Sequence, residues 1–377
     1  MTRGPSPDLI PPDLVQSSKT TVHRRAMNIL GPMLGLILVV FVGGLAEGAR
    51  EGSLNYWSPQ NQCLILTQTV TVALGAIGMT LVIISAGIDL SAGSLIALTA
   101  VASAWVVREF APSDDATLSG QAAVWIPLLA VLVGIAVGTL AGATNGLLIT
   151  RLKLAPFIIT LGMMSFARGA TEGIANMQRI DAPLNWIADF TAANLRVFHL
   201  NLHAAFTLPV LGQVRIDWVG PVAISAAVLV TGLLAVGAGV LLGRMRLGRH
   251  IFAIGSNEAT ARLCGIAVER TKCIVYALAG ATFGLAGVTD FGRLSVGDPS
   301  TAMGKELDII AAVVIGGGSL NGGSGSLFGS LIGALLVAHL RNLCVHLGLP
   351  TYVQKMVVGA VIIVAVAVNH LRERQKD

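Results

Sequence analysis

The chain has few charged residues. Only 12% of its 377 residues are Asp, Glu, Lys or Arg, whereas soluble domains carry roughly 25%. Aromatic residues are also scarce, at 5%, while 54% of the residues are hydrophobic. Apolar runs of about 18 to 26 residues recur from Asn28 to Asn369, each long enough to cross a bilayer as a helix. The composition excludes a soluble globular protein and predicts an all-α integral membrane protein.

Cysteine is scarce too. The four cysteines lack the Cys-x-x-Cys spacing of zinc and redox motifs, and they are Cys63, Cys264, Cys273 and Cys344. The second and third fall in the most basic loop, which we expect in the reducing cytoplasm, so we predict no disulfide. The alternative is a pair between the first and the last, near the outer face.

Catalytic and nucleotide-binding motifs are lacking as well. The only Gly-Lys pair, Gly304–Lys305, is followed by Glu306 and has no upstream glycine at the P-loop spacing, so nothing here would cradle ATP phosphates. His199 and His203 have i, i+4 spacing but no His-Glu-x-x-His motif. No sequence motif that pairs a nucleophile with a general base is found. We predict no catalytic residue, no metal site and no cofactor in this chain.

The apolar runs predict about ten transmembrane helices. The first, from Asn28 to Ala46, is longer than a signal-peptide core, and no Ala-x-Ala cleavage site follows it, so we expect it to be retained. The expected spans, with bounds good to about 2 to 4 residues, are 28–46, 61–85, 92–107, 123–150, 156–175, 218–243, 274–291, 308–320, 326–345 and 353–370.

Basic residues collect on alternate loops, as the positive-inside rule requires. One side carries Arg24, Arg25, Arg151, Lys153, Arg244, Arg246, Arg249, Arg262, Arg270, Lys272, Arg372, Arg374 and Lys376. The loops 47–60, 108–122 and 176–217 carry acidic residues instead. We therefore predict a multi-pass protein of the bacterial inner membrane with both termini cytoplasmic. The net charge of +5 reflects these basic cytoplasmic loops and not a nucleic-acid-binding surface.

The two ends of the chain differ from the apolar centre. Residues 1–27 contain Pro5, Pro7, Pro11 and Pro12 ahead of a basic cluster, which predicts a disordered cytoplasmic tail. A transmembrane domain is expected over 28–370, with its longest inner loop at 244–273. Residues 371–377 form a second cytoplasmic tail.

Two glycine-rich segments interrupt the apolar runs, at 85–94 and 316–326, and each leads into a Ser-Leu pair and another apolar helix. This similarity predicts an internal repeat with broken helices near Gly87–Gly93 and Gly316–Gly325. Paired broken helices indicate a solute path; the alternative is two ordinary cytoplasmic turns. The candidate path residues are Gly87, Asp89, Ser91, Gly93, Ser94, Gly316, Gly317, Gly318, Ser319 and Asn321.

The long inner loop predicts a short capped helix. Ser256–Asn257–Glu258 supplies a capping residue and an acid for the first turn, helix-forming residues follow, and Gly265 ends the segment. By itself this is an ordinary solvated loop helix.

Four segments, in order, resemble the ribose, xylose and galactose permease family of ABC importers, within the superfamily that also includes branched-chain amino acid permeases. The resemblance covers about 60–370, and its segments are GMTLVIISAGIDLSAGSLIALTAV at 78–101, NGLLITRLKLAPFIITLGMMSFARG at 145–169, GRHIFAIGSNEATARLCGI at 248–266 and ELDIIAAVVIGGGSLNGGSGSLFGSLIGAL at 306–335.

The resemblance implies a permease subunit that forms the path of a monosaccharide such as ribose. It implies four partners: a cytoplasmic ATPase that binds the ATP and Mg²⁺, a periplasmic sugar-binding protein, a second permease copy or a related permease, and membrane lipid; no nucleic acid is implied. The loop helix resembles the segment that couples to the ATPase, which comprises Ser256, Asn257, Glu258, Ala259, Ala261, Arg262, Leu263, Gly265 and Ile266.

The chain departs from the family pattern at a few positions. Thr171 and Glu172 stand where apolar residues are expected, and Asp290 precedes Arg293, the arginine that matches the pattern. Arg168 and Glu172 lie four residues apart on one helical face, which predicts a structural ion pair rather than a solute contact.

Other functions remain open from the sequence. A proton- or sodium-coupled secondary transporter would also have broken helices, and Asp89 or Asp290 would then bind the coupling ion. A membrane enzyme would need a catalytic cluster. If the chain is an ABC permease, its solute could instead be a nucleoside, a signalling furanone or a branched-chain amino acid. The permease sequence leaves this open because we expect the binding protein to set most of the solute selectivity.

Overall fold

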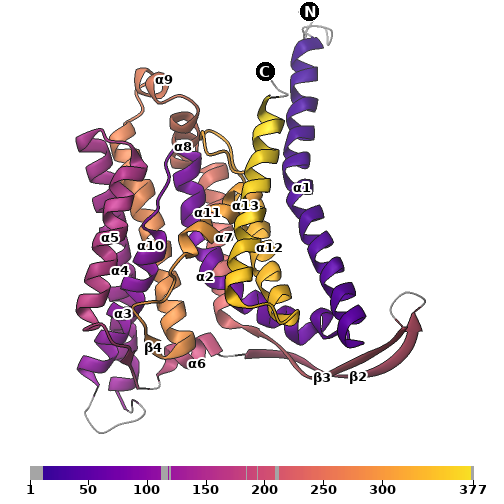
Figure 1. Ribbon diagram of the computed structural model, residues 1–377. Helices are drawn as coiled ribbons and strands as arrows, with labels where there is room; N and C mark the ends of the chain where they lie inside the picture. The colour runs from indigo at the N-terminus through magenta and orange to yellow at the C-terminus, as the bar shows by residue number, and fades with distance from the viewer. Residues whose placement is uncertain are drawn as a thin grey trace, which may run out of the picture.

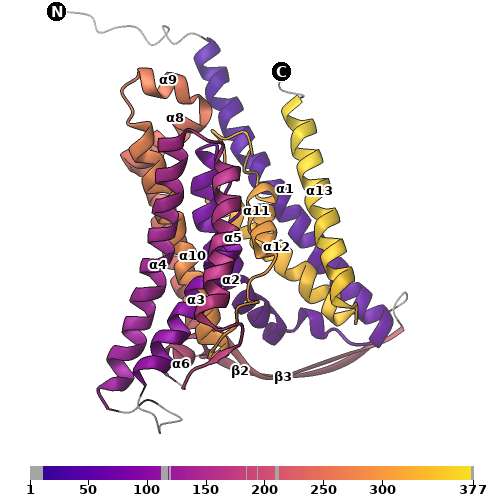
Figure 2. The ribbon, with the colours of Figure 1, turned by 60° about the vertical axis from the view of Figure 1, so that its left-hand side comes forward.

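The computed structural model describes residues 12–111, 118, 120–183, 185–192, 194–208 and 212–374. These residues form a bundle of helices standing side by side, with a long β-hairpin across one end (Figure 1). The first and last helices both have their free ends at the end of the bundle that carries helix α9 (Figures 1 and 2). We call this the α9 end and the opposite one the hairpin end. The predicted all-α membrane fold is confirmed.

Ten helices correspond to the predicted spans. They are α1 (Pro12–Glu51), α2 (Pro59–Ile84), α3 (Ala92–Phe110), α4 (Ala122–Leu152), α5 (Pro156–Ile174), α7 (Ala226–Arg244), α10 (Val268–Leu294), α11 (Lys305–Ile315), α12 (Leu327–His346) and α13 (Thr351–Arg374). Within the described residues, seven are long and apolar enough to cross a membrane, and α5, α11 and α13 are not among them. The 11 residues of α11 rise only about 16 Å, so the count of ten is approximate.

The order helix, glycine break, helix occurs twice, in α2–α3 and in α11–α12. Both breaks lie where the sequence predicted them. The two units differ in length, because α2 has 26 residues and α11 has 11.

Helix α1 begins inside the segment for which a disordered tail was expected. Its first residue is Pro12, and proline suits the first helical position because its missing N–H has no partner there in any helix. Residues 1–11 lie outside the described residues. At the other end, α13 runs to Arg374, into the expected tail at 371–377, and residues 375–377 also lie outside the described residues.

The predicted start of the helix at 218 is wrong. Strand β3 (Gly212–Ser225) occupies this stretch and pairs antiparallel with β2 (Asn194–Leu208), and helix α7 begins only at Ala226. The Ser225 hydroxyl accepts a hydrogen bond from Ala227 N at 3.3 Å and caps the helix. The strand was readable from alternating apolar residues, which are Val214, Ile216 and Trp218.

The hairpin fastens the end of α1. Arg215 N donates to Gly52 O at 2.8 Å, and Leu54 N donates to Arg215 O at 3.2 Å. The Trp218 indole N–H donates to Leu54 O at 3.1 Å. The hairpin thus lies across the bundle as a strap, as Figure 1 shows.

Helix α2 is the centre of the bundle. It packs against α10, α12, α11 and α7, and 83% of its most apolar stretch is buried. Outer helices instead expose large apolar side chains, as expected of surfaces that face lipid; examples are Leu34, Leu140, Leu233 and Ile363.

Glycine allows α4 and α10 to touch through their backbones. A Cβ on Gly138 would lie 2.3 Å from Gly280 O, and one on Gly280 would lie 2.1 Å from Gly138 O. Such contact favours helix association in lipid, where no hydrophobic force drives helices together.

Residues 295–304 fold back into the bundle, and we call them the re-entrant segment. Its strand β4 (Val296–Gly297) pairs with β1 (Ile180–Asp181). Gly297 packs beside Ala104 of α3, whereas Ala302 O would lie 2.8 Å from a Cβ on Gly93, near the other end of the same helix. Since Gly93 and Ala104 are about 16 Å apart along α3, the segment climbs from the hairpin end towards the α9 end, and α11 starts inside the bundle.

The remaining elements are short. They are the 3-10 helix η1 (Asn55–Trp57), α6 (Trp186–Ala192), α8 (Arg246–Ser256) and α9 (Glu258–Leu263).

Candidate functional site

The two glycine breaks meet in space, although they are more than two hundred residues apart in the sequence. Gly323 N donates to Ile84 O at 2.9 Å. Gly322 and Gly323 have φ of +86° and +71°, a region that glycine adopts without strain. A Cβ on Gly255, in the last turn of α8, would lie 1.7 Å from Ile84 O. We call these four residues the glycine junction; it joins both breaks to the chain that leads into α9.

The first break forms a buried polar network rather than an open path. Asp89, Ser91 and Ser94 have no exposed surface. The Asp89 Oδ1 atom accepts from Ser91 N at 2.9 Å and Ser91 Oγ at 2.5 Å, and the Asn145 amide donates to Ser91 Oγ at 3.0 Å. Within the described residues, Asp89 Oδ2 and the Tyr276 hydroxyl have no hydrogen-bond partner. Asp89 Oδ2 and the Tyr276 hydroxyl could therefore form hydrogen bonds with a further polar group.

Helices α4 and α5 hold this break in place. Asn145 lies about 10 Å of helix rise from the end of α4, so the network is inside the bundle. Thr160 Oγ1 of α5 accepts from Leu90 N at 3.1 Å and donates to Ile88 O at 3.3 Å. Asn145, Thr160 and Tyr276 were not among the predicted path residues, because each is a single polar residue in an apolar run.

Two predicted path glycines sit where no side chain fits. A Cβ on Gly87 would lie 2.5 Å from the Tyr276 hydroxyl oxygen, and one on Gly93 would lie 2.1 Å from Glu306 Oε2 as well as 2.8 Å from Ala302 O. The contact between Gly93 and Ala302 O joins the start of α3 to the re-entrant segment.

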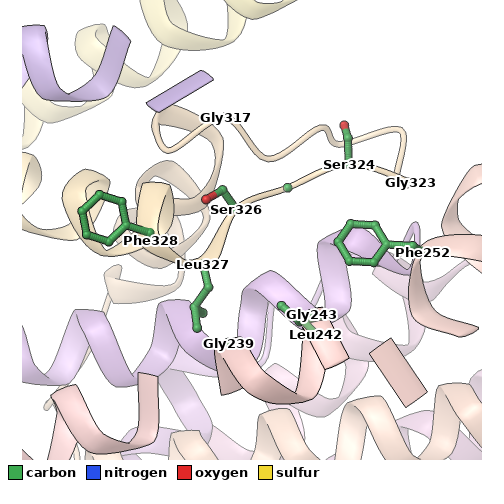
Figure 3. A pocket seen from close by; sticks show the side chains of 11 residues that line it. Gly239, Leu242, Gly243, Phe252, Gly317, Gly323, Ser324, Ser326, Leu327 and Phe328 are labelled. Atoms are coloured by element: carbon green, nitrogen blue, oxygen red, sulfur yellow. The ribbon is translucent and has the colours of Figure 1, made fainter. Parts of the chain in front are cut away.

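The second break borders a cavity of about 700 Å³ between α7, α8 and the start of α12 (Figure 3). Gly317 and Gly323 line it, and Phe252 of α8 and Leu327 of α12 approach it from two sides in Figure 3. The other predicted residues differ in exposure: Gly316, Gly318 and Ser319 are buried and Asn321 is exposed. The structure brings the two breaks together but does not itself define a continuous path through them.

Buried charges position the start of α11. The Asp290 carboxylate accepts from Thr71 Oγ1 at 2.7 Å and from Lys305 Nζ at 2.9 Å, with Arg293 at 3.5 Å. Asp308 accepts from Arg341 of α12 at 2.5 Å. Because an unpaired charge at membrane depth is costly, these pairs tie α11 to α10, α2 and α12.

The predicted ion pair between Arg168 and Glu172 is not formed. The Arg168 guanidinium instead donates to Pro299 O at 2.6 Å and to Thr301 O at 3.4 Å. These two carbonyls belong to the re-entrant segment and have no helical hydrogen-bond partner. They therefore need a donor more than the Glu172 carboxylate does, because that carboxylate is partly solvated.

A second cavity, of about 370 Å³, lies between the end of α5 and the re-entrant segment. We call it the outer cavity. Its lining residues are Glu172, Met177, Gln178, Arg179, Asp298, Pro299, Ser300 and Met303.

Helix α9 is capped as the sequence predicted, with Asn257 as the capping residue and Ser256 as the last residue of α8. The Asn257 Oδ1 atom accepts from Thr260 N at 2.9 Å. At the other end, Gly265 has φ +80° and Ile266 N donates to Ala261 O at 3.1 Å, a helix ending that glycine favours.

One face of α9 is anchored, and the other is open. Ala261 is 4% exposed and packs in a small cluster with Ile254 and Val268. The exposed face carries Ala259, Arg262 and Leu263, and Leu263 is 88% exposed. A large apolar side chain in such a position is available to a protein partner.

Charged pairs stiffen the loop around α9. Glu258 accepts from Lys272 Nζ at 2.6 Å and lies 3.5 Å from Arg262. Arg262 also pairs with Glu269, and this hydrogen bond raises the pKa of the Arg262 guanidinium above its ordinary value. The short helix is therefore tied to the first turn of α10.

His199 and His203 do not lie on one face of a helix. His199 and His203 lie in strand β2, where four residues span about 13 Å instead of one helical turn. Among the described residues, no group of three or more His, Cys, Asp or Glu side chains is arranged to hold a metal ion. All four cysteines are free.

Known proteins resemble this chain along most of its length. The family model described as branched-chain amino acid transport system, permease component, matches residues 62–366. The ribose import permease protein of Escherichia coli (strain K12) is 37% identical over 341 residues, which cover 90% of this chain and 92% of that protein. The ribose import permease protein of Bacillus subtilis (strain 168) is 33% identical over 356 residues, covering 94% and 97%.

A xylose permease is similar as well. The xylose transport system permease protein of Haemophilus influenzae is 34% identical over 376 residues, which cover 89% of this chain and 94% of that protein. No solved structure matches the chain. The family match and these relatives together establish that the chain belongs to the branched-chain amino acid transport system permease family, whose members include ribose and xylose permeases.

Proposed function

We propose that the chain is the permease subunit of an ATP-driven ABC importer and forms the membrane path for a monosaccharide of the ribose type. The names of its relatives support the sugar class. The observation that carries the mechanism is the glycine junction, because Gly255, in the last turn of α8 that leads into α9, touches both Ile84 and Gly323. Movement of α9 would thus act directly on both breaks.

The partner that would move α9 is a separate ATPase subunit, which would bind the ATP and Mg²⁺. Leu263 offers it an exposed apolar contact, and the basic residues of the loop offer charge. The α9 end is then cytoplasmic, in agreement with the positive-inside rule. The outer ends of α1 and α13 lie at the same end (Figure 1), so both termini would be cytoplasmic in the inner membrane.

A second permease copy would cover the face formed by α5 and the re-entrant segment. Non-helical backbone at membrane depth does not face lipid, yet Met303 in this segment and Leu307 in the first turn of α11 are exposed. On α5, Ser165, Gly169 and Gly173 are exposed at i, i+4 and i+8, and a stripe of small residues suits close helix packing. A periplasmic binding protein would then deliver the solute to the hairpin end between the two copies.

Reconstitution tests this function. Proteoliposomes containing the chain, its ATPase and its binding protein should take up D-ribose or D-xylose only when ATP is supplied on the α9 side. Removing the ATPase should abolish uptake.

The competing function is ion-coupled transport. The observation that favours it is Asp89 Oδ2, which has no hydrogen-bond partner in the part of the chain that the structure describes. Asp290, by contrast, is already neutralised by Lys305 and Arg293. Uptake by the chain alone, driven by a proton or sodium gradient, would establish this alternative and refute the ABC function.

A further inference from the structure

The outer cavity has the size of a small-molecule site. Its volume of about 370 Å³ lies within the range of roughly 300–1,000 Å³ typical of ligand pockets. One wall is the last turn of α5 with the turn that follows, and the other is the re-entrant segment. Glu172 lies about 24 Å of helix rise from the start of α5, so the cavity is near the hairpin end of the bundle.

The walls of this cavity are fixed to each other. Arg179 Nε lies 2.8 Å from Asp298 Oδ2. The β1–β4 pairing places Ile180 opposite Gly297, directly beside this ion pair. On the inner side, Arg168 donates to Pro299 O. A cavity held at three points keeps its shape without a ligand, which lowers the entropic cost of binding.

The polar groups suit a neutral solute with several hydroxyl groups. Asp298 Oδ1 is occupied, since it accepts from Ser300 N at 2.8 Å and from Ser300 Oγ at 2.7 Å. Within the described residues, the Glu172 carboxylate and the Gln178 amide have no side-chain hydrogen bond. A carboxylate accepts from hydroxyl groups, and an amide both donates and accepts, so together they match a pair of neighbouring hydroxyls.

Other ligand classes fit less well. The Glu172 carboxylate would repel an anionic solute, because Arg179 is paired with Asp298 and Arg168 donates to the carbonyls of Pro299 and Thr301. The apolar lining includes Met177 and Met303, which are 80% and 69% exposed. Flexible methionine side chains adapt to small apolar surfaces such as the C–H face of a sugar ring. A divalent cation would need more ligands than the carboxylates of Glu172 and Asp298 offer.

We propose that the outer cavity binds the hydroxyl groups of a monosaccharide before the solute passes the re-entrant segment, with Glu172 and Gln178 as its main contacts. This inference rests on the proposed function and adds to it a binding site in the permease itself. Glu172 then acts as a selectivity residue and not as the partner of Arg168.

The test measures sugar binding without the binding protein. The full-length chain, with its ATPase subunits, is placed in lipid nanodiscs, and saturation-transfer difference NMR is recorded with D-ribose, D-xylose, D-galactose and, separately, L-valine at millimolar concentration. We expect difference signals from at least one sugar and none from valine. Glu172→Gln should weaken this signal about tenfold, the effect of losing a charged hydrogen bond, and Gln178→Ala should also weaken it.

Glu109→Gln is the matched control, because this exposed carboxylate at the end of α3 lies outside the cavity; it should leave the signal unchanged. No signal from any sugar, a signal from valine instead, or equal signals from the wild type and both cavity variants would overturn the site. ATP-dependent uptake in proteoliposomes is measured in parallel. If uptake persists while sugar binding to the cavity fails, only this inference is refuted; if ATP-dependent uptake itself is absent, the proposed function fails.

Discussion

Replacing Ala261 by proline tests whether α9 transmits force between the ATPase and the glycine junction. Ala261 N donates to Asn257 O at 3.0 Å, and proline would remove this donor. The proline ring would also collide with the same Asn257 carbonyl, four residues earlier in the chain. Since Ala261 is 4% exposed, the surrounding side chains leave the ring no alternative position.

The expected cost is about 3 kcal/mol or more for a proline in a helix interior, which lowers the ratio of folded to unfolded α9 about 100-fold. The membrane-spanning helices lie outside this loop and should still insert. We expect the variant to reach the membrane at a near-normal level, to lose co-purification with its ATPase or stimulation of ATP hydrolysis, and to fail in uptake.

Ala267→Pro is the matched control. This residue is exposed, lies outside the coupling segment and precedes α10 with φ −73°, a value that proline adopts without strain. It should retain uptake and ATPase binding. Normal ATP-dependent uptake by Ala261→Pro would falsify the coupling role of α9.

A cysteine at Ser256, in a background free of native cysteines, should react with a membrane-impermeant thiol reagent only in inside-out vesicles; labelling of intact cells would reverse the topology. Gly87→Leu and Gly93→Leu should each abolish uptake at normal assembly with the ATPase, because their side chains would displace Tyr276 or the backbone of the re-entrant segment, and transport by both variants would refute the assignment of the first break to the path. Asp290→Ala should lower stability by about 1.5–3 kcal/mol, because it removes the buried acceptor of Thr71 and Lys305 while leaving partly solvated cations, and an unchanged midpoint in thermal unfolding of the purified protein would contradict the structural role of this carboxylate.

Much of the helical architecture could be predicted from the sequence because membrane helices are limited by length and polarity alone. The predicted bounds of α3 and α12, for example, differ from the observed ones by no more than a few residues. The prediction failed at α7, where an apolar stretch continues back into strand β3. Hydropathy does not separate a strand from a helix, and only the alternation of side chains along β3 carries that information.

The capped helix α9 was predictable for a different reason. Its signals are local: Asn257 at the start and Gly265 at the end act on backbone groups within four residues. Partners of charged side chains were less predictable. Arg168 had a suitable carboxylate four residues away, but its actual acceptors, Pro299 O and Thr301 O, are about 130 residues further along the chain.

The sequence by itself determined that this protein is an apolar helical bundle with two glycine breaks and one capped helix in its most basic loop, because composition, periodicity and caps are local properties of the chain. Only the tertiary structure decided that the breaks meet each other at Gly323 and Ile84, that Gly255 links them to α9, and that the re-entrant segment forms one wall of the outer cavity. These contacts join residues far apart in sequence. They depend on how closely whole helices approach, which the backbone packing of glycine sets and no local pattern encodes.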